Sequence, residues 1–118
     1  LKAALEAKYG VDVKCVTMDV TDLDRVAGLP AELLPLEVDI LINNAGLALG
    51  VAGADSNSIS DIQQMMATNV TALMAMSAAF LPGMKARGKG HLINIGSIAG
   101  HEAYAGGSGY CASKAAVT

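Results

Sequence analysis

Two spacings of hydrophobic residues alternate along the chain, and they predict alternating helices and strands. Leu1–Tyr9 has apolar residues at helical spacing, and Val11–Val20 mixes Val, Cys and Met with a polar alternation typical of a strand. The next segment, Asp22–Leu34, predicts a helix that an acidic residue can cap at its start. We expect Pro30 to break or restart this helix, because proline removes a backbone donor.

The rest of the chain continues the alternation. Val38–Ile42 is an apolar run with one acidic residue, typical of a parallel strand buried on both faces. Ser60–Leu81 has apolar residues at helical spacing and should end before Pro82, and His91–Ile95 predicts another strand. A last helix should begin near Ser108. Helices that alternate with strands in this order predict an α/β fold with a parallel sheet.

Composition excludes several classes of protein. The chain has 118 residues, 53% of them hydrophobic, and a formal charge of −3, so it offers no basic surface for nucleic acid. No apolar run reaches the roughly 18 residues of a membrane span, and no membrane partner is expected. Cys15 and Cys111 lack the spacing of metal ligands, so we expect no metal and a cytoplasmic protein with reduced thiols.

Polar residues follow all three predicted strands. The strands end in Asp19–Val20, Asn43–Gly46 and Gly96–Ser97. Ligands of open parallel sheets bind at the carboxyl ends of the strands, so these segments should face one binding site. Each of them alone could be ordinary turn chemistry. Their shared position is what indicates a site.

Tyr110 and Lys114 are four residues apart, so on a helix they share one face. An ammonium group beside a phenol favours the phenolate, and such a tyrosine can serve as an acid or base near neutral pH. The spacing alone is weak evidence, because many solvated helices contain it by chance. Its position thirteen residues after Ser97 strengthens it.

Three motifs together resemble the short-chain dehydrogenase/reductase family. They are Asn43-Asn44-Ala45-Gly46 after a strand, Ser97 at the next strand end, and Tyr110-x-x-x-Lys114. The resemblance covers essentially the whole chain. It implies part of a Rossmann-like, doubly wound parallel sheet in a three-layer αβα sandwich, without its first βαβ unit and its C-terminal elements.

The resemblance also implies a role for each catalytic candidate. Tyr110 would donate the proton in reduction and accept it in alcohol oxidation. Lys114 would favour the ionised form of Tyr110 and hydrogen-bond the nicotinamide ribose. Ser97 would hydrogen-bond the substrate oxygen, where charge develops as hydride moves. Asn69 matches the asparagine that holds a water in a proton relay behind the lysine.

The same resemblance assigns cofactor contacts. Asp19, with Val20 beside it, matches the adenine-contacting aspartate. Asn43, Ala45 and Gly46 match the segment that supports the central sheet and runs past the cofactor. Tyr110 and Lys114 are implied contacts as well. The cofactor would be NADP or NAD. The sequence does not distinguish the two, because no Gly-rich pyrophosphate turn follows a strand here and the residues that read the ribose 2′ position normally lie upstream.

The implied activity is hydride transfer between NAD(P) and a secondary alcohol or carbonyl of a small molecule. Asn43–Gly50, Pro82–Met84 and Asn94–Ser97 are similar to the branch that oxidises serine and other 3-hydroxy acids with NADP. Two alternatives stay open, a non-catalytic dinucleotide-binding regulator and a sugar-nucleotide epimerase. The family commonly forms dimers or tetramers, so a homo-oligomer is implied.

The ends of the chain carry a further expectation. The chain lacks an initiator Met and ends within a predicted helix, so we expect residues 1–118 to be the central part of a single dehydrogenase domain. In the strand order 3-2-1-4-5-6, two strands should lie between Val11–Val20 and Val38–Ile42. Without them Val11–Val20 has no neighbour, and we expect the isolated segment to be poorly folded and inactive.

Overall fold

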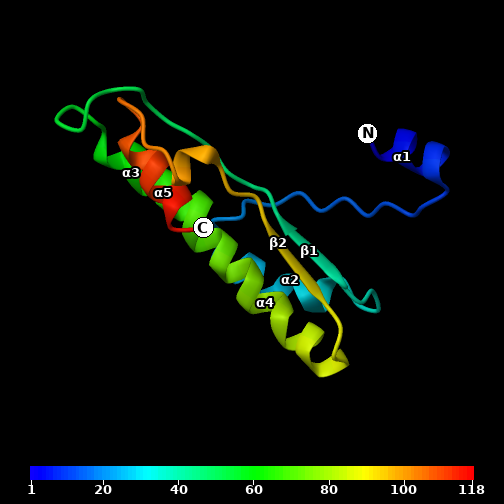
Figure 1. Ribbon diagram of the computed structural model, residues 1–118. Helices are drawn as coiled ribbons and strands as arrows, with labels where there is room; N and C mark the ends of the chain where they lie inside the picture. Colours follow the sequence, from blue (N-terminus) through cyan, green and yellow to red (C-terminus); the bar gives the residue numbers. More distant parts are fainter.

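The computed structural model describes residues 1–118, and its centre is a two-stranded parallel sheet (Figure 1). Strand β1, Ile40–Asn43, pairs with β2, His91–Asn94, so that Ile40 lies opposite His91 and Asn43 opposite Asn94. The predicted parallel sheet is therefore confirmed. Strand β1 begins two residues later than predicted and includes Asn43, and β2 ends one residue before Ile95.

The predicted strand Val11–Val20 is wrong for these residues. The segment runs without sheet pairing from α1, Lys2–Tyr9, to the turn before the next helix, and Figure 1 shows it as a thin extended connection. A strand is held by hydrogen bonds to a neighbour, and neither β1 nor β2 pairs with this segment, so the predicted lack of a sheet neighbour is confirmed. Helix α1 was predicted correctly and ends at Gly10 in the left-handed conformation, but none of its residues is buried.

Helix α2, Leu23–Glu32, begins as predicted but is not broken at Pro30. The Asp22 carboxylate caps it by accepting a hydrogen bond from the Arg25 amide, 3.0 Å away. Pro30 lies in the last turn, so its missing N–H costs the helix only one bond before the helix ends. Val26 is almost wholly buried and holds the helix in place.

Helices α3, Ile59–Met66, and α4, Ala72–Arg87, form one continuous run because the π-helix η1, Ala67–Thr71, joins them. The predicted end at Leu81 is wrong, since α4 continues through Pro82 and ends at Gly88, which has a φ of 64°. Phe80 and Met84 lie on either side of Pro82 and are buried, so packing offsets the lost backbone bond.

By length and composition the run Ile59–Arg87 is long and apolar enough to cross a membrane, with a mean hydropathy of 1.3. We expected no membrane span because no uninterrupted apolar run was long enough, and this helix corrects that expectation as far as length and composition go. Mostly buried core helices pass the same test, but only 22% of this window is buried here. Here Asn69 and Ser77 hydrogen-bond to other segments, and Phe80 and Met84 pack into the core.

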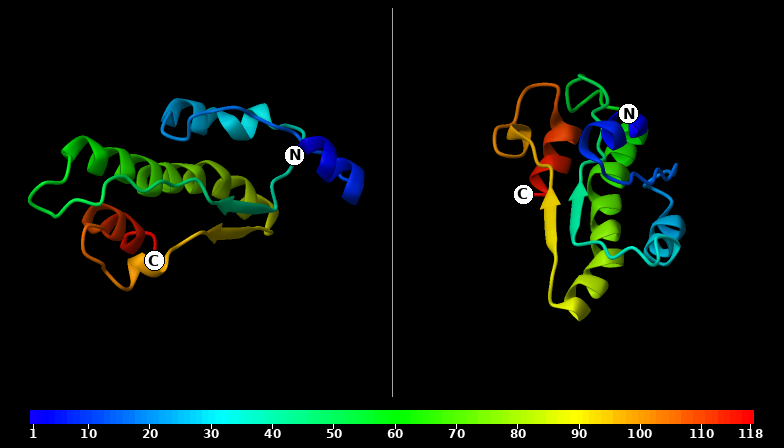
Figure 2. Two further views of the ribbon diagram at one scale, coloured as in Figure 1. Left: turned by 90° about the horizontal axis from the view of Figure 1, so that it is seen from above. Right: turned by 90° about the vertical axis from the view of Figure 1, so that its right-hand side faces the viewer.

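The core lies on one face of the sheet only. Leu41 of β1 packs with Leu29 of α2 and with Phe80 and Met84 of α4. Figure 2 shows α4 beside the sheet with α2 beyond it. On the opposite face Ile40 and Ile42 remain 59% and 56% exposed. These residues therefore form two layers of an α/β fold, and the third layer of the expected sandwich is not among them.

The end of α4 is tied to the start of β1 by charge. Arg87 Nη2 donates to the Val38 carbonyl at 2.6 Å and lies 3.7 Å from Asp39 Oδ1. Lys89 Nζ donates to Asp39 Oδ2 at 2.6 Å, and this hydrogen bond lowers the pKa of the Asp39 carboxyl. These contacts hold the end of α4 against the residues just before β1.

We expect residues 1–118 alone to unfold without a cooperative thermal transition. Only 15 of 118 residues are buried, and the radius of gyration is 16.6 Å. A compact chain of this length has a radius of about 13.5 Å. Circular dichroism during heating checks the expectation. A sharp transition from a native-like spectrum would contradict it.

Candidate active site

A bracket of polar side chains fixes the carboxyl ends of both strands. Asn43, at the end of β1, donates from Nδ2 to Asn94 Oδ1 at 2.9 Å and to Ser77 Oγ at 3.0 Å. Ser77 in turn donates to the Leu73 carbonyl of its own helix at 2.8 Å. Asn43 is buried, so its amide group joins β1, β2 and α4 from inside the structure.

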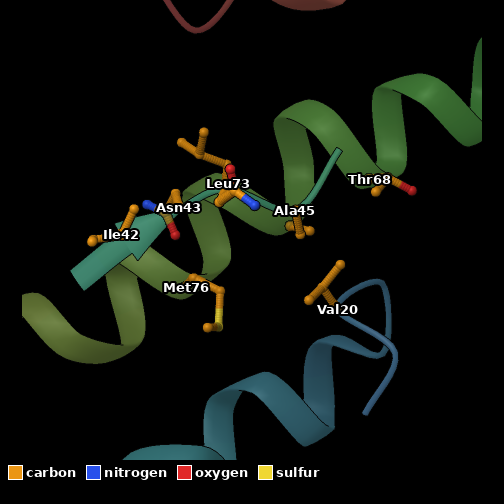
Figure 3. A pocket seen from close by; sticks show the side chains of 9 residues that line it. Val20, Ile42, Asn43, Ala45, Thr68, Leu73 and Met76 are labelled. Carbon is orange, nitrogen blue, oxygen red and sulfur yellow. The ribbon is translucent and has the colours of Figure 1, made fainter. Parts of the chain in front are cut away.

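A small pocket opens beside this bracket, and we call it the Asn43 pocket (Figure 3). Its volume is ≈ 60 Å³. Three of the predicted cofactor residues, Val20, Asn43 and Ala45, line it together. The other lining residues are Ile42, Asn44, Thr68, Ala72, Leu73 and Met76. The pocket therefore joins the end of the extended segment to the end of β1, although no sheet pairing connects them.

Asp19 lies next to this pocket in a turn of its own. Its Oδ1 accepts hydrogen bonds from the Thr21 amide and the Thr21 hydroxyl, both at 2.8 Å. The backbone bond and then the hydroxyl bond lower the pKa of the Asp19 carboxyl. The exposed carboxylate is thus ionised and held in one orientation beside Val20.

A second hollow, the Tyr110 cleft, opens on the other side of the same loop and has a volume of ≈ 280 Å³. Tyr110 and Lys114 reach it from α5, Ser108–Ala115. The rest of its lining comes from the segments that follow the two strands: Asn44, Gly46, Leu47, Ala48, Ile95 and Gly96. Asn44 lines both hollows, so the loop after β1 separates them.

Lys114 is a buried cation with a single protein partner. Its side chain is 7% exposed, and Nζ donates to the Ile95 carbonyl at 2.9 Å. The same ammonium lies 6.0 Å from the centre of the Tyr110 ring. Lysine has three donors, so two remain for a ligand in the cleft. Hydroxyl groups of a sugar or an alcohol are acceptors that suit them.

Asn69 lies in the π-helix and is almost wholly buried. Its Oδ1 accepts from the Leu47 amide at 2.8 Å, and its Nδ2 donates to the Leu47 carbonyl at 2.8 Å and to Ser113 Oγ at 2.9 Å. The side chain therefore fixes a wall of the Tyr110 cleft. Sequence reasoning selected Asn69 but missed both partners and the π-helix, and no local signal in the sequence marks them.

Gly46 makes this arrangement possible by its size. A Cβ at this position would lie 3.2 Å from Asn69 Oδ1 and 3.7 Å from Lys114 Nζ. Both groups thus approach the loop backbone from two different helices. A larger side chain at position 46 would crowd both groups.

Ser97 begins η2, the 3₁₀ helix Ile98–Gly100, and its Oγ accepts from the Ala99 amide at 3.2 Å. It follows Gly96, which lines the Tyr110 cleft, but Ser97 is not among the lining residues. Its hydroxyl proton has no acceptor in the structure and can be donated. Helix η2, which Ser97 precedes, packs against α5.

Comparisons with known proteins agree with one another. A family model described as short chain dehydrogenase matches residues 1–118. An NADP-dependent 3-hydroxy acid dehydrogenase of Schizosaccharomyces pombe is 47% identical over 116 residues, which are 96% of this chain and 44% of that protein. The chain therefore spans less than half the length of this relative.

Solved structures lead to the same family. Serine dehydrogenase from Escherichia coli has a TM-score of 0.89 and 42% identity, over 98% of this chain and 54% of that chain. The closed form of serine dehydrogenase complexed with NADP⁺ has a TM-score of 0.87 and 42% identity, over 98% of this chain and 47% of that chain. The arrangement of the described elements is thus that of a known Rossmann-like fold.

Enlarging Gly46 should destabilise the complete protein. In Gly46→Ala the new methyl group meets two buried polar groups that are held by hydrogen bonds, so we expect a loss of about 1–3 kcal/mol in the free energy of unfolding. Denaturant titration measures it. Gly28→Ala is the matched control, because a Cβ there meets nothing within 4 Å and alanine suits helix α2 better. Equal stability of the two variants would show that the loop has room to spare.

Proposed function

Because the chain belongs to the short-chain dehydrogenase family, we propose that the protein containing it is an NADP-dependent oxidoreductase that interconverts a secondary alcohol and a carbonyl. The observation that carries the proposal is the Tyr110 cleft, where a buried lysine ammonium lies beside a tyrosine ring. The chain spans only part of its relatives, so the activity is assigned to the complete protein.

The residues of the cleft suit a nicotinamide cofactor. Lys114 offers two donors for the hydroxyls of a ribose, and the glycine at position 46 lines the same cleft and lets Lys114 and Asn69 lie against the loop backbone. Val20, Asn43 and Ala45 line the smaller pocket across that loop, where the adenine end would lie, with Asp19 next to it. The bound cofactor would supply the hydride acceptor or donor.

The protein side chains would handle the proton. In alcohol oxidation Tyr110 would accept the hydroxyl proton of the substrate, and the Lys114 ammonium would stabilise the negative charge of its phenolate. Ser97 would donate a hydrogen bond to the substrate oxygen, where charge develops as the carbonyl forms. Asn69 completes the set by holding the wall of the cleft through Leu47.

We propose a 3-hydroxy acid such as serine as the substrate. Support comes from two relatives, the S. pombe 3-hydroxy acid dehydrogenase at 47% identity and the E. coli serine dehydrogenase structure at 42%. The first is described as NADP-dependent, which favours NADP over NAD. Initial rates with serine, other 3-hydroxy acids, sugars and steroids, each with both cofactors, test the assignment.

A non-catalytic regulator has no need of Ser97, Tyr110 and Lys114 together, so the intact set favours an enzyme. A sugar-nucleotide epimerase would bind its cofactor but produce no net change in the absorbance of reduced nicotinamide. A net absorbance change in the rate panel therefore distinguishes the dehydrogenase from both alternatives, and conversion of a sugar nucleotide without such a change would distinguish the epimerase from the regulator. We further propose that residues 1–118 are the central part of one cytoplasmic dehydrogenase domain.

We also propose a homo-oligomer, a dimer or a tetramer, built on α4 and α5. Met74 and Leu81 on α4 are 64% and 38% exposed in this chain and would be covered in such an assembly. Light scattering of the complete protein would measure its mass. A monomer mass would remove the proposal without affecting the catalytic one.

Replacing Tyr110 with phenylalanine should abolish most turnover but spare cofactor binding. The change removes only the hydroxyl group, so kcat should fall on the order of 10²–10⁴-fold, as expected for the loss of an acid/base. Absorbance of the reduced nicotinamide measures the rate, and fluorescence titration measures NADP binding. Tyr9→Phe is the matched control, since Tyr9 lies exposed on α1, and it should keep normal turnover. Near-normal turnover in Tyr110→Phe would refute the role of Tyr110.

A further inference from the structure

We propose that Ser113 is a positioning residue that orients the Tyr110–Lys114 pair toward the cleft. The proposal rests on the proposed dehydrogenase function and adds a residue to it. Ser113 is completely buried, and its hydroxyl donates to the Tyr110 carbonyl at 2.8 Å. The same oxygen accepts from Asn69 Nδ2 at 2.9 Å, across 44 positions of sequence.

The direction of these hydrogen bonds is fixed by the backbone. The Leu47 amide can only donate and the Leu47 carbonyl can only accept, so the Asn69 side chain must turn its oxygen to the first and its nitrogen to the second. Its second N–H then points to Ser113 Oγ, which must accept. The hydroxyl proton of Ser113 is left for the Tyr110 carbonyl.

This hydroxyl therefore connects α5 to the opposite wall of the cleft. Through Asn69 it ties the backbone of Tyr110 to Leu47, which lines the cleft. The next residue, Lys114, anchors the same helix to the Ile95 carbonyl, which belongs to the segment after β2. Two adjacent side chains thus fix the rotation of α5 against two different strand-end segments. The direction of the Tyr110 ring follows from that rotation.

An alanine at position 113 would fill nearly the same space but could not hold the helix this way. One N–H of Asn69 would remain buried and unpaired, and the structure would relax to satisfy it. A shift of about 1 Å in a catalytic group can cost on the order of 100-fold in rate. If Ser113 were only a buried structural residue, Ser113→Ala would lower the stability of the protein. If Ser113 positions the pair, the same variant should lower kcat, and that loss should require Tyr110.

The test uses the complete protein with serine and NADP. We expect Ser113→Ala to lower kcat by about 10–100-fold, while KM and the dissociation constant for NADP change by less than about 3-fold. In a Tyr110→Phe background the same change should cost almost nothing further, because the residue it orients is no longer active. Ser113→Cys keeps a donor and an acceptor at this position, with weaker hydrogen bonds and a slightly larger atom, and should lie between serine and alanine, which also covers the case of an unfolded alanine variant.

Ser108→Ala is the matched control. Ser108 lies on the same helix and accepts a hydrogen bond from Asn57 Nδ2, but it is exposed and does not line the Tyr110 cleft. Its kcat should stay near that of the unmodified protein. Normal kcat in Ser113→Ala, or an equal loss with and without Tyr110, would overturn the positioning role alone. An unmodified protein without turnover would overturn the proposed function and this inference together.

Discussion

The amide side chain of Asn69 holds the candidate site together. It satisfies both backbone groups of Leu47 and the hydroxyl of Ser113, and it lies in a helix that contacts α5. A buried amide has few ways to satisfy its donors and acceptor, and each unmet group costs free energy. The geometry of three separate segments therefore follows from one side chain. The Tyr110 cleft is the space these segments leave between them.

The helix that carries Asn69 is held in place by packing against one face of the small sheet. Leu41 packs against Phe80 and Met84, and this contact places the long helix along the strands so that its π-helical part reaches the strand ends. The Asn43 bracket then joins both strands to the same helix. Ile40 and Ile42 on the other face are exposed and take no part in this core, although Ile42 also lines the Asn43 pocket.

How much of this the sequence could predict depends on whether the interaction is local. The helical spacing of Tyr110 and Lys114 and the polar residues at strand ends are local patterns. The structure brings Tyr110 and Lys114 to one cleft with Gly46 and Gly96, but Val20, Asn43 and Ala45 line the smaller pocket and Ser97 lines neither. Pairing of Val11–Val20 requires neighbours elsewhere in the chain, so a strand pattern alone could not decide it. Helix α4 passes through Pro82 because of packing, and the bond between Asn69 and Ser113 spans 44 positions, so neither follows from neighbouring residues.

The π-helix has a consequence for how this helix can change in length. Each residue turns an α-helix by about 100°. The five residues Ala67–Thr71 set the angle between the start of the helix, which packs on α5, and its later part, which packs on the sheet. A one-residue insertion or deletion there would rotate these two surfaces against each other. Natural variation in helix length should therefore gather at its ends and spare this turn.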